Sequence, residues 1–320
     1  MIKASVQKTI DESLSGKRLD KFIKSAYSKF KRDDIKESIA CGLITVNSKA
    51  LPPHYHLKSG DVVSGDIKTF GAVKLRANND VSLEIANETE DFIIINKPAG
   101  VVSTPDKNHE NDSLVSGLLA RYPQMMREFK GAAYLGLVHR LDKGASGLLI
   151  AAKNMAAFKE LREMLQLMRI RKTYYVLVQG RMKKSEGKIV APLTKVKDGW
   201  VVKNIPSADP DTDDSKPAVT KFKVMKKFNK ATYLNVQIVT GRTHQIRAHF
   251  AAVDHPVVGD ALYGFDAEGF EKAYQIIPSR LILHAQGLSF FFSGKRYTFV
   301  KNPPEDFMNI IFRCDSLSTR

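Results

Sequence analysis

Hydrophobic residues near the start of the chain recur at the spacing of a helix. Leu19, Phe22, Ile23 and Ala26 lie at positions i, i+3, i+4 and i+7, which predicts an amphipathic helix within residues 16–26. Lysines and arginines occupy most of the other positions of this segment. We therefore expect a helix with one apolar and one basic face.

A second short helix is predicted around Ile35 and Ile39, with Gly42 as its C-terminal cap. Residues 43–46 are rich in strand-forming side chains, and a Gly-Asp turn at residues 60–61 leads into another apolar pair. The start of the chain therefore predicts a small α+β unit.

The rest of the chain mixes apolar runs with helical patterns. Residues 92–95 and 148–152 are continuously apolar, as in buried strands, and residues 174–178 favour a strand. Apolar residues have helical spacing at residues 158–168 and alternate at residues 234–238. Because helices and strands do not alternate regularly, we expect an α+β fold whose sheet is mixed, mainly antiparallel and packed against helices.

A polar segment without any period, residues 68–84, is interpreted as a linker. It would separate a small domain, residues 1–67, from a larger domain, residues 85–320.

The charge of the chain indicates its class of partner. The 320 residues include 50 Lys and Arg against 34 Asp and Glu, a formal net charge of +16, which favours nucleic acid over a membrane surface. The chain has no signal-peptide-like start and no apolar run of roughly 18 residues, so we expect a cytoplasmic monomer without membrane contact. Cys41 and Cys314 have no Cys or His at metal-ligand spacing, so both are expected to be reduced and structural, with no metal site.

One carboxylate, Asp142, stands between cations and small turn-forming residues. The sequence from His139 to Gly147 reads His-Arg-Leu-Asp-Lys-Gly-Ala-Ser-Gly and lies between two apolar segments. We expect Asp142 on a short loop anchored at both ends. An Asp in a loop is most often a turn residue, so its interpretation depends on what surrounds it.

A second dense motif, Gly-Arg-Thr-His-Gln-Ile-Arg, spans residues 241–247. Thr243 is the predicted N-cap of a helix, because apolar residues follow at helical spacing from Ile246. Arg247 should then project from the first turns of that helix.

Both motifs resemble those of the RluA-type pseudouridine synthases. That family shares the His-Arg-Leu-Asp run, the whole second motif, an Asn-Lys-Pro-x-Gly turn at residues 96–100 and Lys-x-Tyr at residues 172–174. The chain departs at Ala145, where the family usually has Thr, and we expect this difference to alter only loop rigidity. The resemblance implies a mainly antiparallel catalytic domain that isomerises uridine in RNA without a cofactor.

The resemblance also implies the roles of individual residues. Asp142 is the catalytic carboxylate, Arg247 its salt-bridge partner, and Tyr174 the face on which the flipped uracil stacks. A guanidinium beside a carboxylate shielded by a base would keep it ionised. The other implied substrate-binding residues of this domain are His139, Arg140 and Arg242. An aliphatic side chain from residues 280–285 is expected to line the base pocket.

About the first 65 residues resemble the S4 domain, a small RNA-binding module. The match includes Arg18-Leu19-Asp20 and the Gly-Leu-Ile-Thr-Val-Asn run at residues 42–47. It implies phosphate contacts from basic residues of the two helices, namely Lys17, Arg18, Lys21, Lys31 and Arg32. A second RNA contact suits a large structured substrate, which points to large-subunit ribosomal RNA or its assembly precursor.

Other function classes give different expectations. A metal-dependent hydrolase would draw on the histidines, but His244 and His249 are separated by about 140° around an ideal helix. A non-catalytic binder of structured RNA would tolerate replacement of Asp142, and a synthase of this type acting on tRNA is a further alternative. Attack by Asp142 on the sugar, attack on the base and proton abstraction all use the same carboxylate and stay open here.

Overall fold

The computed structural model of the protein describes residues 3–40, 42–68, 75–106, 108–129, 134–196, 199–202 and 215–318. Two compact units are present, Met1–Ala72 and Val73–Arg320. Cys41 and residues 69–74 of the predicted linker lie outside the described residues.

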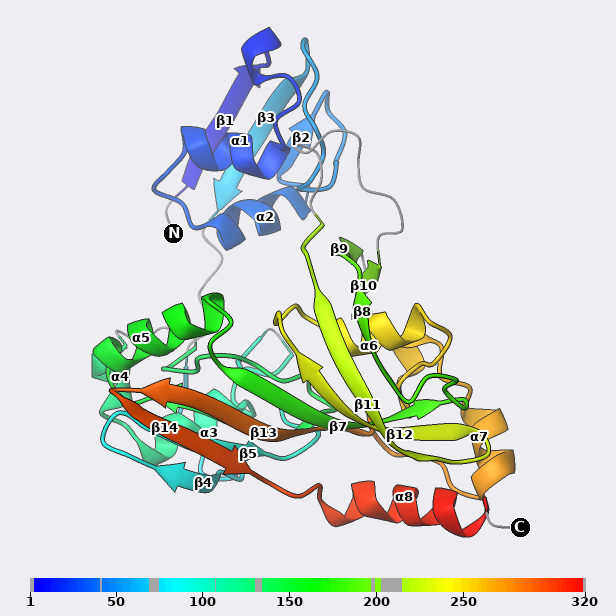
Figure 1. Cartoon of the computed structure of the whole chain (residues 1–320). Coiled ribbons are helices and arrows are strands. Elements are labelled where there is room, and N and C mark those ends of the chain that lie inside the picture. Colours follow the sequence, from blue (N-terminus) through cyan, green and yellow to red (C-terminus); the bar gives the residue numbers. More distant parts are fainter. Residues whose placement is uncertain are drawn as a thin grey trace. The chain divides into compact units, whose positions relative to one another are not determined.

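The first unit contains a three-stranded antiparallel sheet, in the order β1-β3-β2, with two α-helices (Figure 1). Its elements are β1 (Lys3–Thr9), η1 (Glu12–Leu14), α1 (Leu19–Ala26), α2 (Arg32–Ala40), β2 (Ile44–Val46) and β3 (Val62–Lys68). Leu19, Ile23 and Ile35 are buried in its core, as the helical spacing predicted. The strand β1 was not predicted, because polar residues follow its buried Val6 and hide the alternation.

The second unit is built on a nine-stranded sheet in the described part of the chain, in the order β4-β5-β6-β13-β7-β12-β11-β8, with β14 paired to β13. Its pairings are antiparallel except for β6 with β13, which confirms the expected fold class. The strands are β4 (Glu84–Glu88), β5 (Phe92–Lys97), β6 (Ser146–Ala152), β7 (Arg171–Gln179), β8 (Glu186–Val190), β11 (Val219–Lys227), β12 (Ala231–Ile238), β13 (Leu283–Phe292) and β14 (Lys295–Val300). A separate hairpin pairs β9 (Leu193–Val196) with β10 (Gly199–Val202).

Helices cover both faces of the sheet (Figure 1). They are α3 (Leu114–Arg121), α4 (Met125–Glu128), α5 (Met155–Gln166), α6 (Gln245–Ala251), η2 (Ala261–Tyr263), α7 (Ala267–Tyr274) and α8 (Glu305–Ser316). Side chains of α6 pack with Val176 of β7, whereas those of α7 and α8 pack with Leu177, which points to the opposite face. Within the described ranges, no helix is long and apolar enough to cross a membrane.

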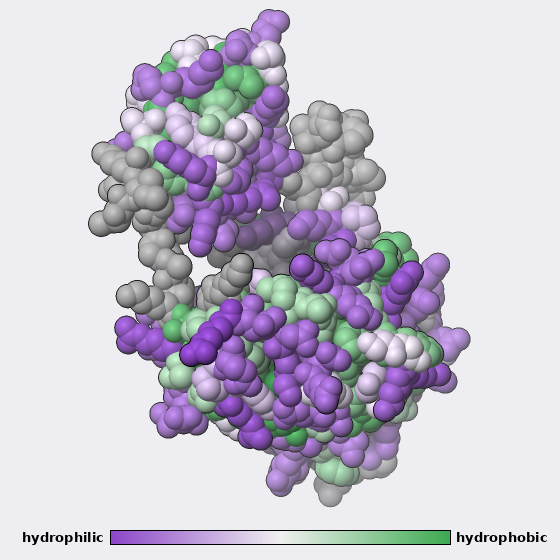
Figure 2. Space-filling view, turned by 90° about the vertical axis from the view of Figure 1, so that its left-hand side faces the viewer, coloured by the Kyte–Doolittle hydropathy of each residue, from purple (hydrophilic) through white to green (hydrophobic). Residues whose placement is uncertain are grey.

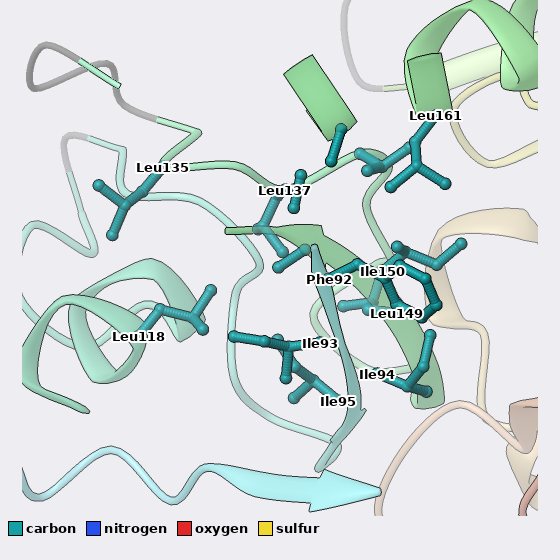
Figure 3. Packing of buried hydrophobic residues seen from close by; sticks show 14 of the residues in the cluster. Phe92, Ile93, Ile94, Ile95, Leu118, Leu135, Leu137, Leu149, Ile150 and Leu161 are labelled. Atoms are coloured by element: carbon teal, nitrogen blue, oxygen red, sulfur yellow. The ribbon is translucent and has the colours of Figure 1, made fainter. Parts of the chain in front are cut away.

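The largest core surrounds β5 and β6. Phe92, Ile93, Ile94 and Ile95 are all fully buried, and Figure 3 shows them beside Leu149 and Ile150 of β6 and Leu118 of α3. A strand that is buried on both faces has a continuous apolar sequence, which is why these two strands were predictable. Hydrophilic side chains cover most of the face of this unit shown in Figure 2, with small hydrophobic patches between them.

Met168 and Cys314 differ in their burial. Met168, which we placed on the apolar face of a helix, lies beyond the end of α5 with φ of 58° and is 56% exposed, so that expectation was wrong. Cys314 is a buried free thiol, and burial raises its pKa to about 12.

Gly147 allows β6 and β13 to approach closely at the base of the Asp142 loop. Its φ is 113°, and an added Cβ would lie 2.3 Å from the carbonyl oxygen of Ala285. The neighbouring Ser146 Oγ lies 2.9 Å from His284 Nδ1, across the parallel pairing of the two strands. The Ser-Gly end of the first motif therefore anchors the loop to the C-terminal part of the sheet.

Candidate active site

The loop that carries Asp142 is held at several points. The amide of Ala145 donates to the carbonyl oxygen of Asp142 at 3.1 Å, which closes a turn directly before β6. Ser103 Oγ donates to the carbonyl oxygen of Leu141 at 2.8 Å and accepts from its amide at 3.1 Å. The backbone at Asp142 is therefore held on one side by the turn to Ala145 and on the other by the hydroxyl of Ser103, which binds the neighbouring Leu141.

Below this loop lies a buried lysine that sequence reasoning treated only as part of a turn. Lys97 is fully buried, and its Nζ donates to the carbonyl oxygens of Pro98, Val101 and Lys143 at 2.7, 2.8 and 3.3 Å. Burial lowers its pKa to about 7, against the opposing charge of Asp142. Lys97 thus joins the turn after β5 to the Asp142 loop.

A cleft of about 950 Å³ opens around Asp142, whose side chain is 22% exposed. Positive charge dominates its lining in the described part of the chain. The cations are Arg140, Lys143, Arg162, Lys172, Arg242 and Arg247, and the carboxylates are Asp106 and Asp142. Such a surplus of positive charge in a confined space favours an anionic ligand.

Arg247 contacts Asp142, although 105 positions separate the two residues. Arg247 lies on α6, and its Nη1 donates to Asp142 Oδ2 at 3.1 Å. Burial disfavours the charged guanidinium, but Asp260 and Asp142 together outweigh that effect and raise the pKa of Arg247. The guanidinium is therefore a permanent positive charge beside the loop carboxylate.

Asp260 is the main site residue that sequence reasoning did not name, because a Gly-Asp pair such as Gly259-Asp260 is common in turns. Its side chain is 1% exposed and accepts from Arg247 Nε at 2.6 Å and from Nη2 at 2.8 Å. The preceding Gly259 has φ of 83° and no room for a Cβ, which would lie 2.0 Å from the carbonyl oxygen of Arg280. The turn thus places a second carboxylate behind the arginine.

Tyr174 lines the same cleft from β7. It is largely buried, and burial together with the charge of Asp142 raises its pKa, so the phenol stays neutral. The adjacent Tyr175 packs in the cluster on the other face of the sheet, as strand geometry requires. Of the aliphatic residues expected near the base, Leu283 lines the cleft.

The predicted N-cap of α6 was wrong. His244 occupies the cap in the left-handed region, with φ of 54°, and makes no side-chain capping bond. This conformation brings His244 Nε2 to 3.9 Å from Asp142 Oδ1, while its Nδ1 lies 3.0 Å from Tyr263 Oη. Burial lowers the pKa of His244 against the opposing charge of Asp142, which favours the neutral ring.

The other predicted substrate-binding residues of this unit also line the cleft. Arg140, two residues before Asp142, is exposed. Arg242 also lines the cleft, and its Nε donates to the carbonyl oxygen of Pro217 at 3.2 Å. His139 Nε2 lies 3.4 Å from the amide of Ile150, and burial lowers the pKa of His139 to about 3. His139 is therefore a neutral residue that supports the loop.

The five basic residues predicted in the first unit differ in their surroundings. Lys17, Lys21 and Lys31 are exposed. Arg18 and Arg32 instead contact the buried Asp20, with nitrogen to oxygen distances of 3.0 and 3.3 Å. Hydrogen bonds and charge from the two arginines outweigh burial and keep the pKa of Asp20 low. These arginines therefore have a structural contact besides any role at the surface.

Two buried histidines of the second unit that lie outside the cleft, His249 and His284, are held by hydrogen bonds. His249 contacts Thr220 Oγ1 and the carbonyl oxygen of Ala191, and His284 contacts Ser146 and the carbonyl oxygen of Lys301. In the ranges that the structure describes, no three His, Cys, Asp or Glu side chains gather as a metal site would require.

Known proteins are similar to this chain in sequence and fold. A family model described as RNA pseudouridylate synthase matches residues 91–252. An uncharacterized RNA pseudouridine synthase of Aquifex aeolicus (strain VF5) is 34% identical over 303 residues, which cover 92% of this chain and 92% of that protein. Ribosomal large subunit pseudouridine synthase D of Zymomonas mobilis subsp. mobilis is 31% identical over 322 residues, with 98% of each chain covered.

A solved structure, human RNA pseudouridylate synthase domain containing 4, superposes with a TM-score of 0.57 at 20% identity and covers 72% of this chain and 93% of that one. That similarity concerns the fold. The family model and the two sequence relatives carry the assignment: the chain belongs to the RluA-type RNA pseudouridylate synthase family and is an RNA pseudouridine synthase.

Proposed function

We propose that this enzyme converts specific uridines of large-subunit ribosomal RNA to pseudouridine, with Asp142 as the catalytic carboxylate. The observation that carries the proposal is the contact of Asp142 with Arg247 in a cationic cleft that Tyr174 also lines. The choice of RNA is supported by the relative from Zymomonas mobilis, whose name specifies the large ribosomal subunit.

The reaction suits a site with one ionised carboxylate. The bond between uracil N1 and ribose C1′ breaks, the base turns, a bond forms between C5 and C1′, and the proton on C5 is lost while N1 gains one. Atoms and electrons balance within the nucleotide, so no oxidant or reductant is needed. Asp142 serves as the nucleophile or base, and Arg247 favours its charged form when the substrate excludes water.

The remaining cleft residues fit the binding of a flipped nucleotide. Tyr174 offers an aromatic face for the uracil, which must leave its stack before it can react. Leu283 would contact the base, and Arg140 would displace and hold the target nucleotide. His139 supports the loop, and Arg242 lies where it could contact backbone or phosphate.

We further propose that the first unit is an S4-like RNA-binding domain. Its exposed Lys17, Lys21 and Lys31 supply positive charge for phosphate, and Arg18 and Arg32 add to that charge while binding Asp20. Phosphate contacts would hold the enzyme on a large RNA without specifying the uridine.

The test is a map of pseudouridines in ribosomal RNA from three strains: wild type, gene deletion and Asp142→Asn. We expect one or more large-subunit sites to be lost in both altered strains, because the amide cannot act as a nucleophile or base. With purified protein, the rate should fall by more than about 10³-fold. Retention of every site in both strains would refute the ribosomal assignment, and loss of a tRNA site instead would redirect it to tRNA.

A further inference from the structure

A buried ammonium group faces the cleft without a counter-charge. Lys172 lies on β7, is 5% exposed and lines the same cleft as Tyr174. Within the described residues, its Nζ has neither a hydrogen-bond partner nor an ion-pair partner. The side chain is largely withdrawn from water but reaches the cleft, so the ammonium is poorly solvated and would gain from an anion bound there.

The surroundings of Lys172 are cationic or neutral. Lys172 and Arg162 both act on His139 as positive charges, and Arg162 Nη1 donates to the carbonyl oxygen of Val138 at 2.9 Å. Gly241 closes one side, since a Cβ added there would lie 2.9 Å from Lys172 Nζ. The group is therefore enclosed by the Val138–His139 segment, α5 and the turn before α6.

Asp142 does not neutralise this lysine. The charge of Asp142 shifts the pKa of Tyr174, His244 and Arg247, whereas burial alone lowers the pKa of Lys172 to about 8. Lys172 thus keeps most of its charge at neutral pH, and the ion pairs of the loop carboxylate are with His244 and Arg247 instead. An anion bound at Lys172 would be separate from the atoms that react at Asp142.

The distance along β7 fits the phosphate of a nucleotide. Lys172 and Tyr174 are two residues apart and point to the same face, so their Cα atoms are separated by roughly 6.6 Å. This separation is similar to that between a pyrimidine base and the phosphate of its own nucleotide. A base stacked on Tyr174 would therefore bring an RNA phosphate within reach of the Lys172 ammonium.

We propose that Lys172, with Arg162 across His139, forms a phosphate subsite for the RNA backbone next to the target uridine. This inference rests on the proposed function, because it takes Tyr174 as the support of the target base. Phosphate binding supplies the missing counter-charge of Lys172 and orients the flipped nucleotide over Asp142.

The first experiment measures binding of a stem-loop RNA copied from large-subunit ribosomal RNA around a uridine that the wild-type protein converts. Wild type is compared with Lys172→Met and with a control, Lys159→Met, an exposed lysine of α5 outside the cleft. We expect Lys172→Met to bind the RNA at least roughly tenfold more weakly than wild type. The negative slope of log affinity against log salt should also become smaller in magnitude by about 0.7, because one phosphate contact is lost. The control should match wild type.

Neutral methylphosphonate groups then locate the contact. Two RNAs are made, each with one methylphosphonate at one of the two phosphates that flank the target uridine. In one of these RNAs the substitution should weaken binding to the wild-type protein and leave binding to Lys172→Met unchanged. An equal loss in both proteins would overturn the proposal. So would a Lys172→Met protein that loses kcat but keeps its affinity and salt slope, because that result would place the charge at the reacting base.

A second probe needs no turnover. Uridine 5′-monophosphate and uridine 3′-monophosphate are each compared with uridine by NMR titration of wild type, Lys172→Met and Lys172→Gln, with circular dichroism to verify folding. One monophosphate should bind wild type more tightly than uridine does, and both variants should lose this preference. A preference that persists in the variants refutes the subsite. A wild-type protein that converts no RNA refutes the proposed function instead, and the two failures are therefore distinct.

Discussion

Arg247 shares its guanidinium between two carboxylates. Nε and Nη2 bind Asp260, which leaves Nη1 for Asp142, and the ring of Tyr263 lies 4.9 Å from the guanidinium carbon. Because the Asp260 contact is bidentate, it fixes the plane of the guanidinium and hence the direction of the free N–H bond. Asp260 is therefore a positioning residue that acts on Asp142 through Arg247.

Replacement of Asp260 by Asn tests this role. The amide keeps one acceptor but removes the charge, so Arg247 should lose its fixed orientation. We expect kcat to fall roughly tenfold to hundredfold with little change in KM, since misplacement of a group at a reacting centre mainly affects the transition state. Single-turnover and steady-state kinetics on the stem-loop RNA provide the measurement.

The matched control for that variant is Asp254→Asn. Asp254 is exposed and has φ of 62°, which Asn also tolerates, so its activity and stability should stay at the wild-type level. Urea unfolding should show that Asp260→Asn loses about 1–3 kcal/mol, because a buried contact to a charged group is weakened. Wild-type kcat in a folded Asp260→Asn protein would contradict the positioning role.

Individual site residues were predictable from the sequence where a dense motif surrounds them. Asp142 among cations, Tyr174 in its Lys-x-Tyr motif and Arg247 on its helix were all named in advance, and the structure brings them to one cleft. Asp260 was missed because a Gly-Asp turn is common, and only its burial reveals a partner. The burial of Lys97 likewise depends on carbonyl groups that no sequence pattern displays.

Among the elements, β6 determines where the Asp142 loop ends. Gly147 lies at its second position and faces the backbone of β13 without room for a side chain. Any side chain there must separate the two strands and so displace the loop.

The variant Gly147→Ala should therefore destabilise the protein severely, by about 3 kcal/mol or more, and reduce the rate of pseudouridine formation. The comparison is Gly294→Ala, at φ of 75° with no heavy atom within 4 Å of the added Cβ, for which we expect a loss of about 1 kcal/mol. Thermal unfolding of both variants gives the measurement. Similar losses in the two proteins would show that strain, and not the approach of β13, limits this position.

Elements were predictable where burial imposes a clear pattern. The apolar runs of β5 and β6 and the alternation in β12 gave correct strands. The strand β1 was hidden by its exposed polar side chains, and the cap of α6 was wrongly placed because His244 takes a left-handed conformation that propensity disfavours. The local sequence does not predict such a strand or helix cap, because contacts with distant parts of the chain determine it.

On the scale of the whole molecule, the proposed function gives the first unit a role in RNA affinity and places the chemistry in the second unit. The first unit has its own core and exposed lysines, and the second contains the complete cleft. The proposal therefore makes RNA affinity separable from catalysis.

A protein that lacks residues 1–72 should bind a large ribosomal RNA fragment roughly 10²-fold more weakly, because the second RNA contact is lost. Its kcat on a short stem-loop should stay within about twofold of wild type, and its salt slope on the large fragment should be smaller in magnitude. Filter binding and single-turnover kinetics measure the two quantities. Unchanged affinity for the large fragment would refute an RNA-binding role for the first unit.

The parallel pairing of β6 with β13 has a consequence for synthesis of the protein. Ser146 and its partner His284 are 138 positions apart, so at ordinary translation rates β6 waits roughly 7–28 s for the strand that completes its pairing. During that time a strand that is apolar from Leu148 to Ala152 has one edge without its neighbour, a state that invites association with other chains. The loop that carries Asp142 is anchored to β13 only after that strand has emerged, so the cleft of a nascent chain stays incomplete until synthesis is nearly finished.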